Sequence, residues 1–126
     1  MTIIFHITTH ADWERAEREG VYRATSLDTQ GFIHFSTAAQ VVDTANRFYS
    51  GQRDLLLLMV DTARLQMDLR YEPPADSPES AERFPHLYGT LNLNAVLQVV
   101  AFPPDADGSW SELPADLDDL DAEMES

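Results

Sequence analysis

The stretch that decides the fold is Asp54–Val60, which reads Asp-Leu-Leu-Leu-Leu-Met-Val. This apolar run is too short for a typical helix, and it does not alternate between apolar and polar residues. A strand that is buried on both faces has this composition, because neither face meets water. The sequence therefore predicts a central strand at Asp54–Val60, with the other elements arranged around it.

The remaining elements are short and do not repeat a strand-helix-strand unit. The other segments that are predicted as strands are Thr2–Ile7, Val21–Tyr22, Phe32–Phe35, Leu65–Glu72 and Ala95–Phe102. Phe84–Gly89 is expected to bring the chain back into the fold after the long loop. Strands that are not separated regularly by helices favour antiparallel pairing. We therefore expect an α+β fold with a split, mostly antiparallel sheet of about six strands and two main helices.

The first helix has recognisable ends in the sequence. Thr9 is placed as its N-cap, with Asp12 three residues later in the manner of a capping box. Trp13 and Ala16 share a face that is expected to dock on the sheet. Gly20 suits the left-handed position that follows a helix.

The second helix is predicted to begin after Ser36 or Thr37 and to end at Gly51. Gln40 is placed to complete a capping box with Thr37. Between the two helices, Asp28–Gly31 carries a turn signal, because Asp and Gly favour tight turns.

The segment Leu65–Glu82 combines a strand with a long loop. Leu65–Glu72 alternates, with Met67 and Tyr71 among its apolar positions, which is typical of a half-buried strand. Pro73–Glu82 then contains three prolines, serines and acidic residues, and is expected to be a binding loop or lid.

Charge divides the 126-residue chain into a body, residues 1–104, and an acidic tail, residues 105–126. The tail contains nine acidic residues and no basic residue, which leaves the body with 13 acidic residues against 8 arginines. An acidic surface repels phosphate backbones, so we expect no general nucleic-acid binding. A local arginine still suffices for one small anion. Within the tail, Pro114–Glu125 is predicted to form either a helix or a disordered segment.

Other features of the composition bear on the location of the protein. The chain has no cysteine, which excludes disulfides, thiolate zinc sites and a cysteine nucleophile and suits the cytoplasm. We see no signal peptide and no apolar run near the length of a membrane span. One domain of this size is expected to be a monomer or a weak homodimer that contacts no membrane.

A segment with candidate functional side chains is Gly31-Phe32-Ile33-His34-Phe35-Ser36, which places an ionisable ring and a hydroxyl in a predicted strand. At a period of two, Phe32, His34 and Ser36 fall on one face of this strand. A buried histidine needs a partner, because an unsatisfied polar group costs about 1–3 kcal/mol. The histidine is therefore either a satisfied core residue or part of a site.

Three histidines, His6, His34 and His86, lie near small hydroxyl residues or glycine, and several readings of them stay open. A zinc site is disfavoured, because only His6 and His10 have a ligand-like spacing, so no metal is expected. A serine hydrolase is disfavoured, because Ser36 has no glycine elbow. The third reading is a ligand with ribose and phosphate groups, held by histidines and hydroxyls, stacked on Tyr88 and paired with an arginine. The arginines considered for that anion are Arg23, Arg70 and Arg83.

The joint pattern resembles a family of small bacterial proteins known as domain of unknown function 952. The resemblance covers about residues 3–102 and rests on the segments Phe5–Thr8, Trp13–Tyr22, Ser26–Leu27, Gly31–Gln40, Ala45–Tyr49 and Phe84–Leu93. That family resembles the ADP-ribosyltransferases and, in its layout, the RNA 2′-phosphotransferases. The resemblance implies an NAD-binding cleft in a split antiparallel sheet.

Carried over residue by residue, the resemblance implies a site. His6 with Thr8 would hold the ribose and amide of NAD, and His34 with Ser36 would flank the nicotinamide end. The transferase glutamate is assigned to Glu72, with His86 or Tyr88 as the alternative occupants of that corner. Ile7 replaces a glycine of the first motif, and no basic cluster for an RNA phosphate is visible.

The predicted site is therefore a set of seven residues. His6, His34 and Glu72 are the catalytic candidates, and the ligand-binding candidates are Thr8, Ser36, His86 and Tyr88. The expected function is binding NAD or a related nucleotide, with transfer or hydrolysis of ADP-ribose. The alternative functions are a binding module for a nucleotide, metabolite or protein that lacks the chemistry, and a protein that acts through its surface. The site requires His6, His34 and Ser36 to converge on one concavity.

Overall fold

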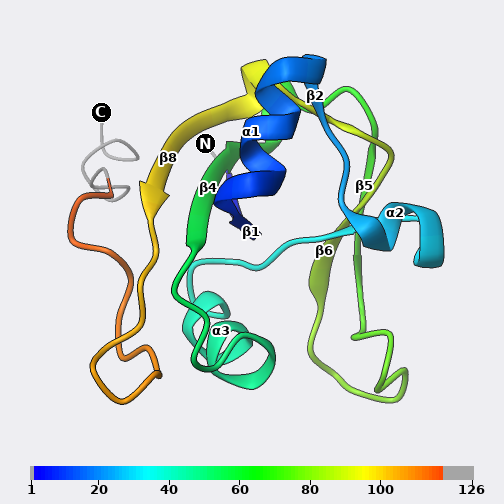
Figure 1. The fold of residues 1–126 in the computed structure, drawn as a ribbon. Coiled ribbons are helices and arrows are strands. Elements are labelled where there is room, and N and C mark those ends of the chain that lie inside the picture. Colours follow the sequence, from blue (N-terminus) through cyan, green and yellow to red (C-terminus); the bar gives the residue numbers. More distant parts are fainter. Residues whose placement is uncertain (1, 118–126) are drawn as a thin grey trace.

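The computed structural model describes residues 2–117 of the chain. Within this range the chain forms eight strands, three α-helices and two short 3₁₀ turns (Figure 1). In chain order they are β1 (Ile3–Thr9), α1 (His10–Glu19), β2 (Val21–Tyr22), α2 (Thr25–Gln30), β3 (Ile33–His34), α3 (Val41–Phe48), β4 (Leu55–Asp61), η1 (Thr62–Arg64), β5 (Asp68–Glu72), β6 (Phe84–Tyr88), β7 (Leu91–Asn92), η2 (Leu93–Ala95) and β8 (Val96–Ala101).

The first sheet has the order β1–β4–β8, and both pairs of strands are antiparallel. The strand β4 lies in the middle, and all of its residues are buried. The prediction of a central strand at Asp54–Val60 is therefore confirmed. Its apolar run is required because both faces of the strand meet other parts of the protein.

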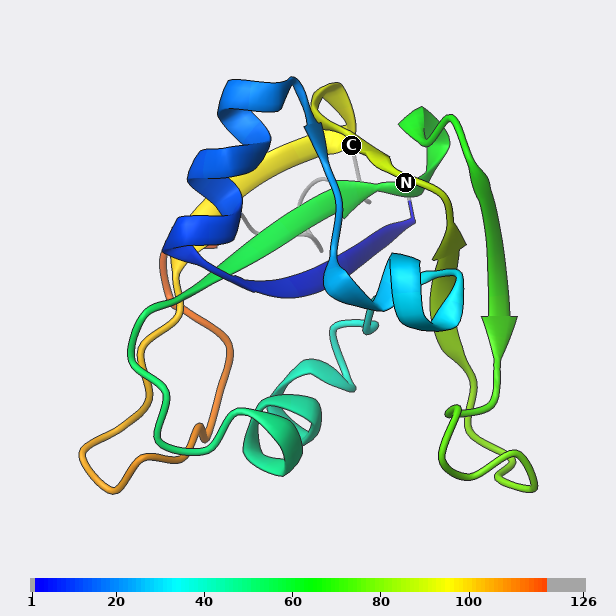
Figure 2. The same ribbon diagram turned by 45° about the vertical axis from the view of Figure 1, so that its right-hand side comes forward.

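The second sheet has the order β3–β6–β5 and is also antiparallel. Figure 2 shows its strands β5 and β6 beside the first sheet and running in a different direction from it. The two sheets are joined by a single bridge, in which the N–H groups of Phe5 and Ser36 each donate to the other residue's carbonyl at 2.8 Å. A small third pair, β2–β7, completes the α+β architecture, which confirms the predicted class.

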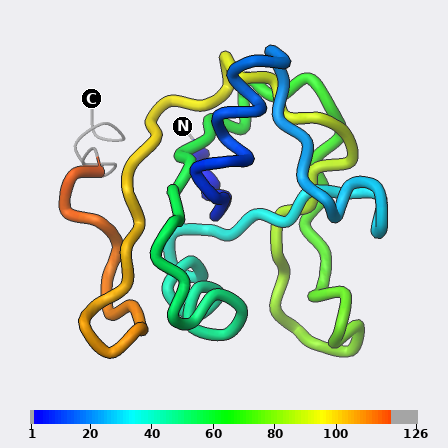
Figure 3. The backbone as a smooth tube through the Cα atoms, viewed as in Figure 1, coloured from blue at the N-terminus to red at the C-terminus, as the bar shows by residue number. Residues whose placement is uncertain are grey.

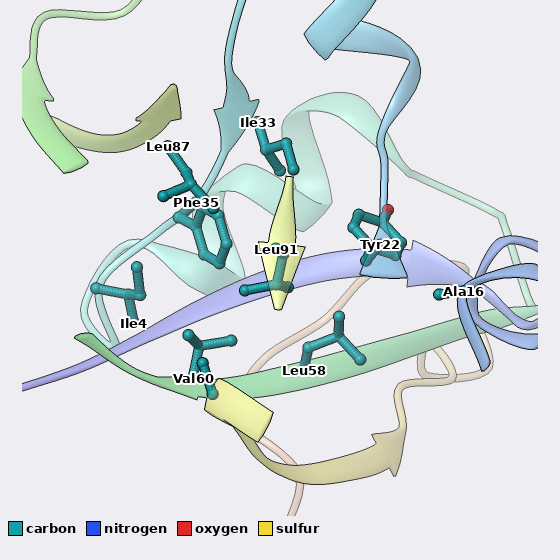
Figure 4. Packing of buried hydrophobic residues seen from close by; sticks show 10 residues of the cluster. Ile4, Ala16, Tyr22, Ile33, Phe35, Leu58, Val60, Leu87 and Leu91 are labelled. Atoms are coloured by element: carbon teal, nitrogen blue, oxygen red, sulfur yellow. The ribbon is translucent and has the colours of Figure 1, made fainter. Parts of the chain in front are cut away.

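Two apolar clusters cover the two faces of the first sheet. Ile4 of β1 and Leu58 of β4 face Ile33 and Leu87 of the second sheet (Figure 4). On the opposite face, Phe5 packs with residues of β4 and of α3. The faces alternate along β1 as the pleat of a strand requires, so His6 and Thr8 share the side of Ile4.

The first predicted helix is confirmed as α1, whereas the second predicted helix, α3, begins later in the chain than expected. The Thr9 side chain accepts a hydrogen bond from the Asp12 N–H at 3.1 Å, and Gly20 takes the left-handed conformation with φ 81°. The Gln40 side chain accepts from the Thr37 N–H at 3.0 Å, as the predicted box requires. However, the helix α3 starts only at Val41, because residues 38–40 form turns.

Other boundaries were predicted incorrectly. The turn expected at Asp28–Gly31 is the end of the helix α2, whose Ser26 hydroxyl donates to the Phe32 carbonyl at 2.8 Å. The helix α3 ends at Phe48 rather than Gly51. The strand expected over Phe32–Phe35 is limited to Ile33–His34, because the backbone of Ser36 pairs with Phe5 of β1 instead of with β6.

The half-buried strand expected at Leu65–Glu72 is shorter and more exposed than predicted. It begins at Asp68 as β5, and Met67 and Tyr71 are 45% and 47% exposed. The reason is that β5 is the edge strand of its sheet, which leaves this part of the chain at the surface. The loop predicted at Pro73–Glu82 contains turns and bends but no helix or strand.

The acidic segment that follows β8 contributes to the core. Trp110 is buried, its ring stacks on Phe102 with centroids 5.4 Å apart, and its indole N–H donates to the Phe102 carbonyl at 3.2 Å. The side chain of Asn46 holds the Trp110 backbone through two hydrogen bonds of 2.8 Å. Figure 3 shows this segment running back along β8, where Gln98 donates to the Asp116 carbonyl at 2.8 Å.

Most of the helix predicted at Pro114–Glu125 falls on residues 118–126, outside the described residues. Among residues 2–117, none of the helices combines the length and the apolar content that crossing a membrane requires.

Candidate functional site

A cleft of about 660 Å³ opens where β1, β3, α3 and the loop after β5 meet. Small-molecule sites commonly enclose about 300–1,000 Å³, so its size suits a ligand. The residues that line the cleft include His6, Thr8, His34, Ser36 and His86. Five of the seven predicted site residues therefore share one concavity, and His6, His34 and Ser36 converge as the sequence required.

His6 is a buried ring whose two nitrogens are both hydrogen-bonded within the protein. Its Nδ1 donates to the His34 carbonyl at 2.5 Å, and its Nε2 lies 2.7 Å from the Tyr22 hydroxyl. Burial lowers the pKa of His6 from 6.5 to about 4. The neutral ring therefore carries its proton on Nδ1 and accepts the Tyr22 proton at Nε2.

The Tyr22 hydroxyl also lies 2.9 Å from the Thr8 hydroxyl. Because Tyr22 donates its one proton to neutral His6, Thr8 donates to the Tyr22 oxygen. Burial raises the pKa of Tyr22 above its ordinary value, so this phenol stays protonated. The chain Thr8–Tyr22–His6 is thus a satisfied network at the inner wall of the cleft.

Tyr22 and its role were not assigned from the sequence. In the sequence, Tyr22 is only an aromatic residue with a hydroxyl group in a two-residue strand, and no periodic pattern relates it to β1. The pairing of β2 with β7 brings it beside His6.

Ser36 and His34 follow one another along the same wall but face different surroundings. The buried Ser36 hydroxyl donates to the Thr44 hydroxyl of α3 at 3.3 Å. His34 is exposed at its edge, and its Nε2 donates to the Gln30 side chain at 2.5 Å. Partial burial and the neighbouring His86 lower the pKa of His34, so the rings of His6 and His34 are both neutral near pH 7.

One ion pair stands at the rim. Arg47 of α3 lies 3.2 Å from Asp76 of the loop after β5, and its guanidinium lies 5.2 Å from the centre of the Phe48 ring. Figure 1 shows α3 and this loop at the same end of the molecule. Arg47 lines the cleft, whereas the predicted anion partners Arg23, Arg70 and Arg83 do not line it.

Glu72 and Tyr88 do not line this cleft. Glu72 borders a smaller adjoining hollow of about 210 Å³, which it shares with Phe32 and His86. One of its carboxylate oxygens accepts from the Tyr88 hydroxyl at 2.6 Å and from His86 Nδ1 at 2.9 Å. These bonds, Tyr88 first, lower the pKa of Glu72, and the carboxylate in turn raises the pKa of Tyr88.

His86 joins the two hollows, because it lines both. It lies opposite His34 in the β3–β6 pair, with ring centroids 5.4 Å apart. Its other neighbour is Phe32, whose ring stacks on it at 4.0 Å. The sequence pattern placed Phe32 and His34 on one face, and the tertiary structure adds His86 between them and Glu72.

Two alternative chemistries have little support in this arrangement. His10, the predicted zinc partner of His6, is an exposed residue at the start of α1, whereas His6 points inward. The only side-chain hydrogen bond of Ser36 within residues 2–117 is to Thr44, so no histidine activates it there. The described residues contain no group of three or more His, Asp or Glu that is arranged to hold a metal ion.

The fold and the cleft define a small α+β protein in which two antiparallel sheets frame a hydroxyl- and imidazole-lined cleft. Residues 7–99 match the model of the family described as protein of unknown function (DUF952), and the chain belongs to this family. The resemblance seen in the sequence is thereby confirmed for the family.

Two solved structures of one similar protein support the same fold. The crystal structure of protein CC0527 from Caulobacter crescentus is 34% identical, with a TM-score of 0.77 over 86% of this chain and 92% of that one. Its solution NMR structure, also 34% identical, gives a TM-score of 0.71 over 86% and 91% of the two chains. No curated protein matches the chain.

Proposed function

We propose that the protein binds a nucleotide of the NAD or ADP-ribose kind in the cleft of about 660 Å³. The observation that carries the proposal is the lining itself. Ribose hydroxyls donate and accept hydrogen bonds, and the wall offers hydroxyls at Thr8 and Ser36 beside the rings of His34 and His86.

The rim supplies what the other parts of such a nucleotide need. Phe48 and Tyr49 offer aromatic surface to a base or a nicotinamide ring. Arg47 offers a planar, permanently charged partner for a phosphate group. The ADP-ribosyltransferase-like resemblance of the sequence points to the same ligand class.

Binding without glycosyl transfer is the form that the geometry favours. Asp12 and Asp76, the carboxylates that line the cleft, are each paired with an arginine, at 2.9 and 3.2 Å. Glu72, the predicted transferase glutamate, lies outside the cleft lining. Transfer or hydrolysis of ADP-ribose is the second candidate, and what favours it is that Glu72 reaches the cleft through His86.

The test is thermal unfolding with NAD and, separately, with ADP-ribose. A ligand at about 100 times its dissociation constant should stabilise the folded chain by about 2.7 kcal/mol. His34→Ala should remove most of this shift, whereas His10→Ala, which changes an exposed histidine on α1, should keep it.

The outcomes separate the candidates. A shift without nicotinamide release supports a binding module, and a shift with release supports transfer chemistry. If neither nucleotide shifts the melting temperature at millimolar concentration, the proposal is refuted and a role for the outer surface is favoured.

Light scattering tests the expected monomer or weak homodimer, and a gel-shift assay tests the expected absence of nucleic-acid binding.

A further inference from the structure

His86 is held more firmly than a side chain at the edge of a cleft usually is. It lies on the middle strand of the second sheet and is only 2% exposed. Phe32 stacks on one face with 21° between the rings, and the His34 ring meets it edge-on. The Glu72 carboxylate lies 2.9 Å from His86 Nδ1, and this hydrogen bond fixes the orientation of the ring.

The contact with Glu72 determines which nitrogen of His86 carries the proton. An ionised carboxylate only accepts hydrogen bonds, so His86 Nδ1 must donate. Glu72 is ionised near neutral pH, because its bonds from Tyr88 and His86 lower its pKa. In the neutral ring, Nε2 therefore presents a lone pair.

That lone pair is open. Within residues 2–117, His86 Nε2 makes no hydrogen bond, yet no buried side-chain nitrogen or oxygen in this range lacks a partner. Nε2 is therefore reached from the accessible surface, although the rest of the ring is covered. Because His86 lines both the cleft and the adjoining hollow, this surface belongs to the site.

We infer that Glu72 and His86 form a carboxylate–histidine dyad, in which His86 Nε2 accepts a hydrogen bond from a hydroxyl group of the ligand or from a water bound beside it. The ligand class is a sugar-containing nucleotide, and for this ligand the inference rests on the proposed function. Glu72 is a positioning residue that acts through His86. From the sequence, Glu72 was predicted as a catalytic candidate acting on the ribose and His86 as a ligand-binding candidate, so the inference changes the role of Glu72 and specifies that of His86.

The same lone pair provides a general base for hydrolysis of an N-glycosidic bond. The water oxygen bonds to the anomeric carbon, and its proton passes to His86 Nε2. The bond from that carbon to the nicotinamide nitrogen breaks, and its electron pair leaves with neutral nicotinamide. The Glu72 carboxylate stabilises the resulting imidazolium, which then loses its proton to solvent.

The first experiment examines the dyad without any ligand. Nitrogen NMR of the imidazole at pH 7.5 should find His86 protonated on Nδ1 and bare on Nε2. Glu72→Ala should move the population toward the Nε2–H form, because the acceptor of Nδ1 is lost. The matched control is Asp68→Asn, which changes an exposed carboxylate on the same face of β5 that pairs with Arg70. A wild-type ring protonated mainly on Nε2 would overturn the inference.

The second experiment uses His86→Asn, whose amide N–H takes the place of Nδ1 toward Glu72 but has no group in place of Nε2. Folding is checked by circular dichroism. Calorimetric titration with ADP-ribose should show about tenfold weaker binding than wild type, equivalent to about 1.4 kcal/mol. Equal affinities of wild type and His86→Asn would refute the acceptor role.

The two readouts separate the failure of this inference from that of the proposed function. If wild type binds neither NAD nor ADP-ribose, the proposed function fails. The NMR measurement of which His86 nitrogen carries the proton then tests the dyad by itself. If wild type releases nicotinamide from NAD, His86→Asn should release it at least about 100-fold more slowly. Release at an unchanged rate would refute the base role, and binding without release would restrict His86 to hydrogen bonding.

Discussion

The buried ring of His6 makes the stability of this protein depend on pH. In the unfolded chain this histidine titrates near 6.5, whereas burial lowers its pKa to about 4 in the folded chain. The folded state therefore binds the proton less well than the unfolded state does. Its contribution to stability is fully present above pH 6.5 and is lost progressively as the pH falls toward 4.

The size of the effect follows from the same difference. Each pKa unit corresponds to about 1.4 kcal/mol, so the interval from 6.5 to about 4 amounts to about 3 kcal/mol in the free energy of unfolding. A loss of this size is a large part of the total, because small domains are stable by about 5–15 kcal/mol. Carboxylates with lowered pKa values, such as Glu72, add to the loss in the same direction.

Urea unfolding at a series of pH values between 4 and 7.5 measures the effect. His6→Gln lowers the stability at pH 7.5, because the network with Tyr22 is broken, but it removes about 3 kcal/mol of the further loss toward pH 4. His10→Gln, at the exposed start of α1, keeps the full loss. If His6→Gln and wild type lose the same stability between pH 7.5 and 4, the buried neutral ring is not the cause and the reasoning is refuted.

Three further predictions concern single contacts. Tyr22→Phe leaves two buried polar partners unsatisfied and should cost about 1–3 kcal/mol in urea unfolding, whereas the exposed Tyr71→Phe should cost close to nothing. Gly89→Ala should cost about 1–3 kcal/mol, because φ is 156° and a Cβ there would lie 2.5 Å from Met67 Cγ; an unchanged melting temperature would contradict this. Trp110→Ala should cost about 3–5 kcal/mol by the same assay, and a variant as stable as wild type would mean that the segment after β8 does not support the core.

The sequence located the elements whose signal is local. The apolar run at Asp54–Val60 is a central strand because every one of its side chains must avoid water. The cap at Thr9 and the glycine after the first helix could be recognised because these interactions lie within a few residues of each other. The family pattern was visible for the same reason, since its motifs are short and contiguous.

Elements whose stability comes from distant partners were predicted less well. The helix α2 is stabilised by the hydrogen bond from Ser26 to the Phe32 carbonyl and by the packing of Leu27 against the core. Its own composition resembles that of a turn, so a turn was predicted there. The strand β3 is cut short because the backbone of Ser36 pairs with Phe5. The exposure of Tyr71 depends on the place of β5 at the edge of its sheet, which no residue in β5 specifies.

The sequence by itself determined the α+β class, the family and the residue types of the cleft, because periodicity and motifs are properties of neighbouring residues. Only the tertiary structure decided how these residues are paired. In the folded chain His6 is hydrogen-bonded to Tyr22, Glu72 contacts His86 outside the cleft lining, and Arg47 lines the cleft. These contacts join segments that are far apart in the chain, and their distances are set by the bridge that joins the two sheets.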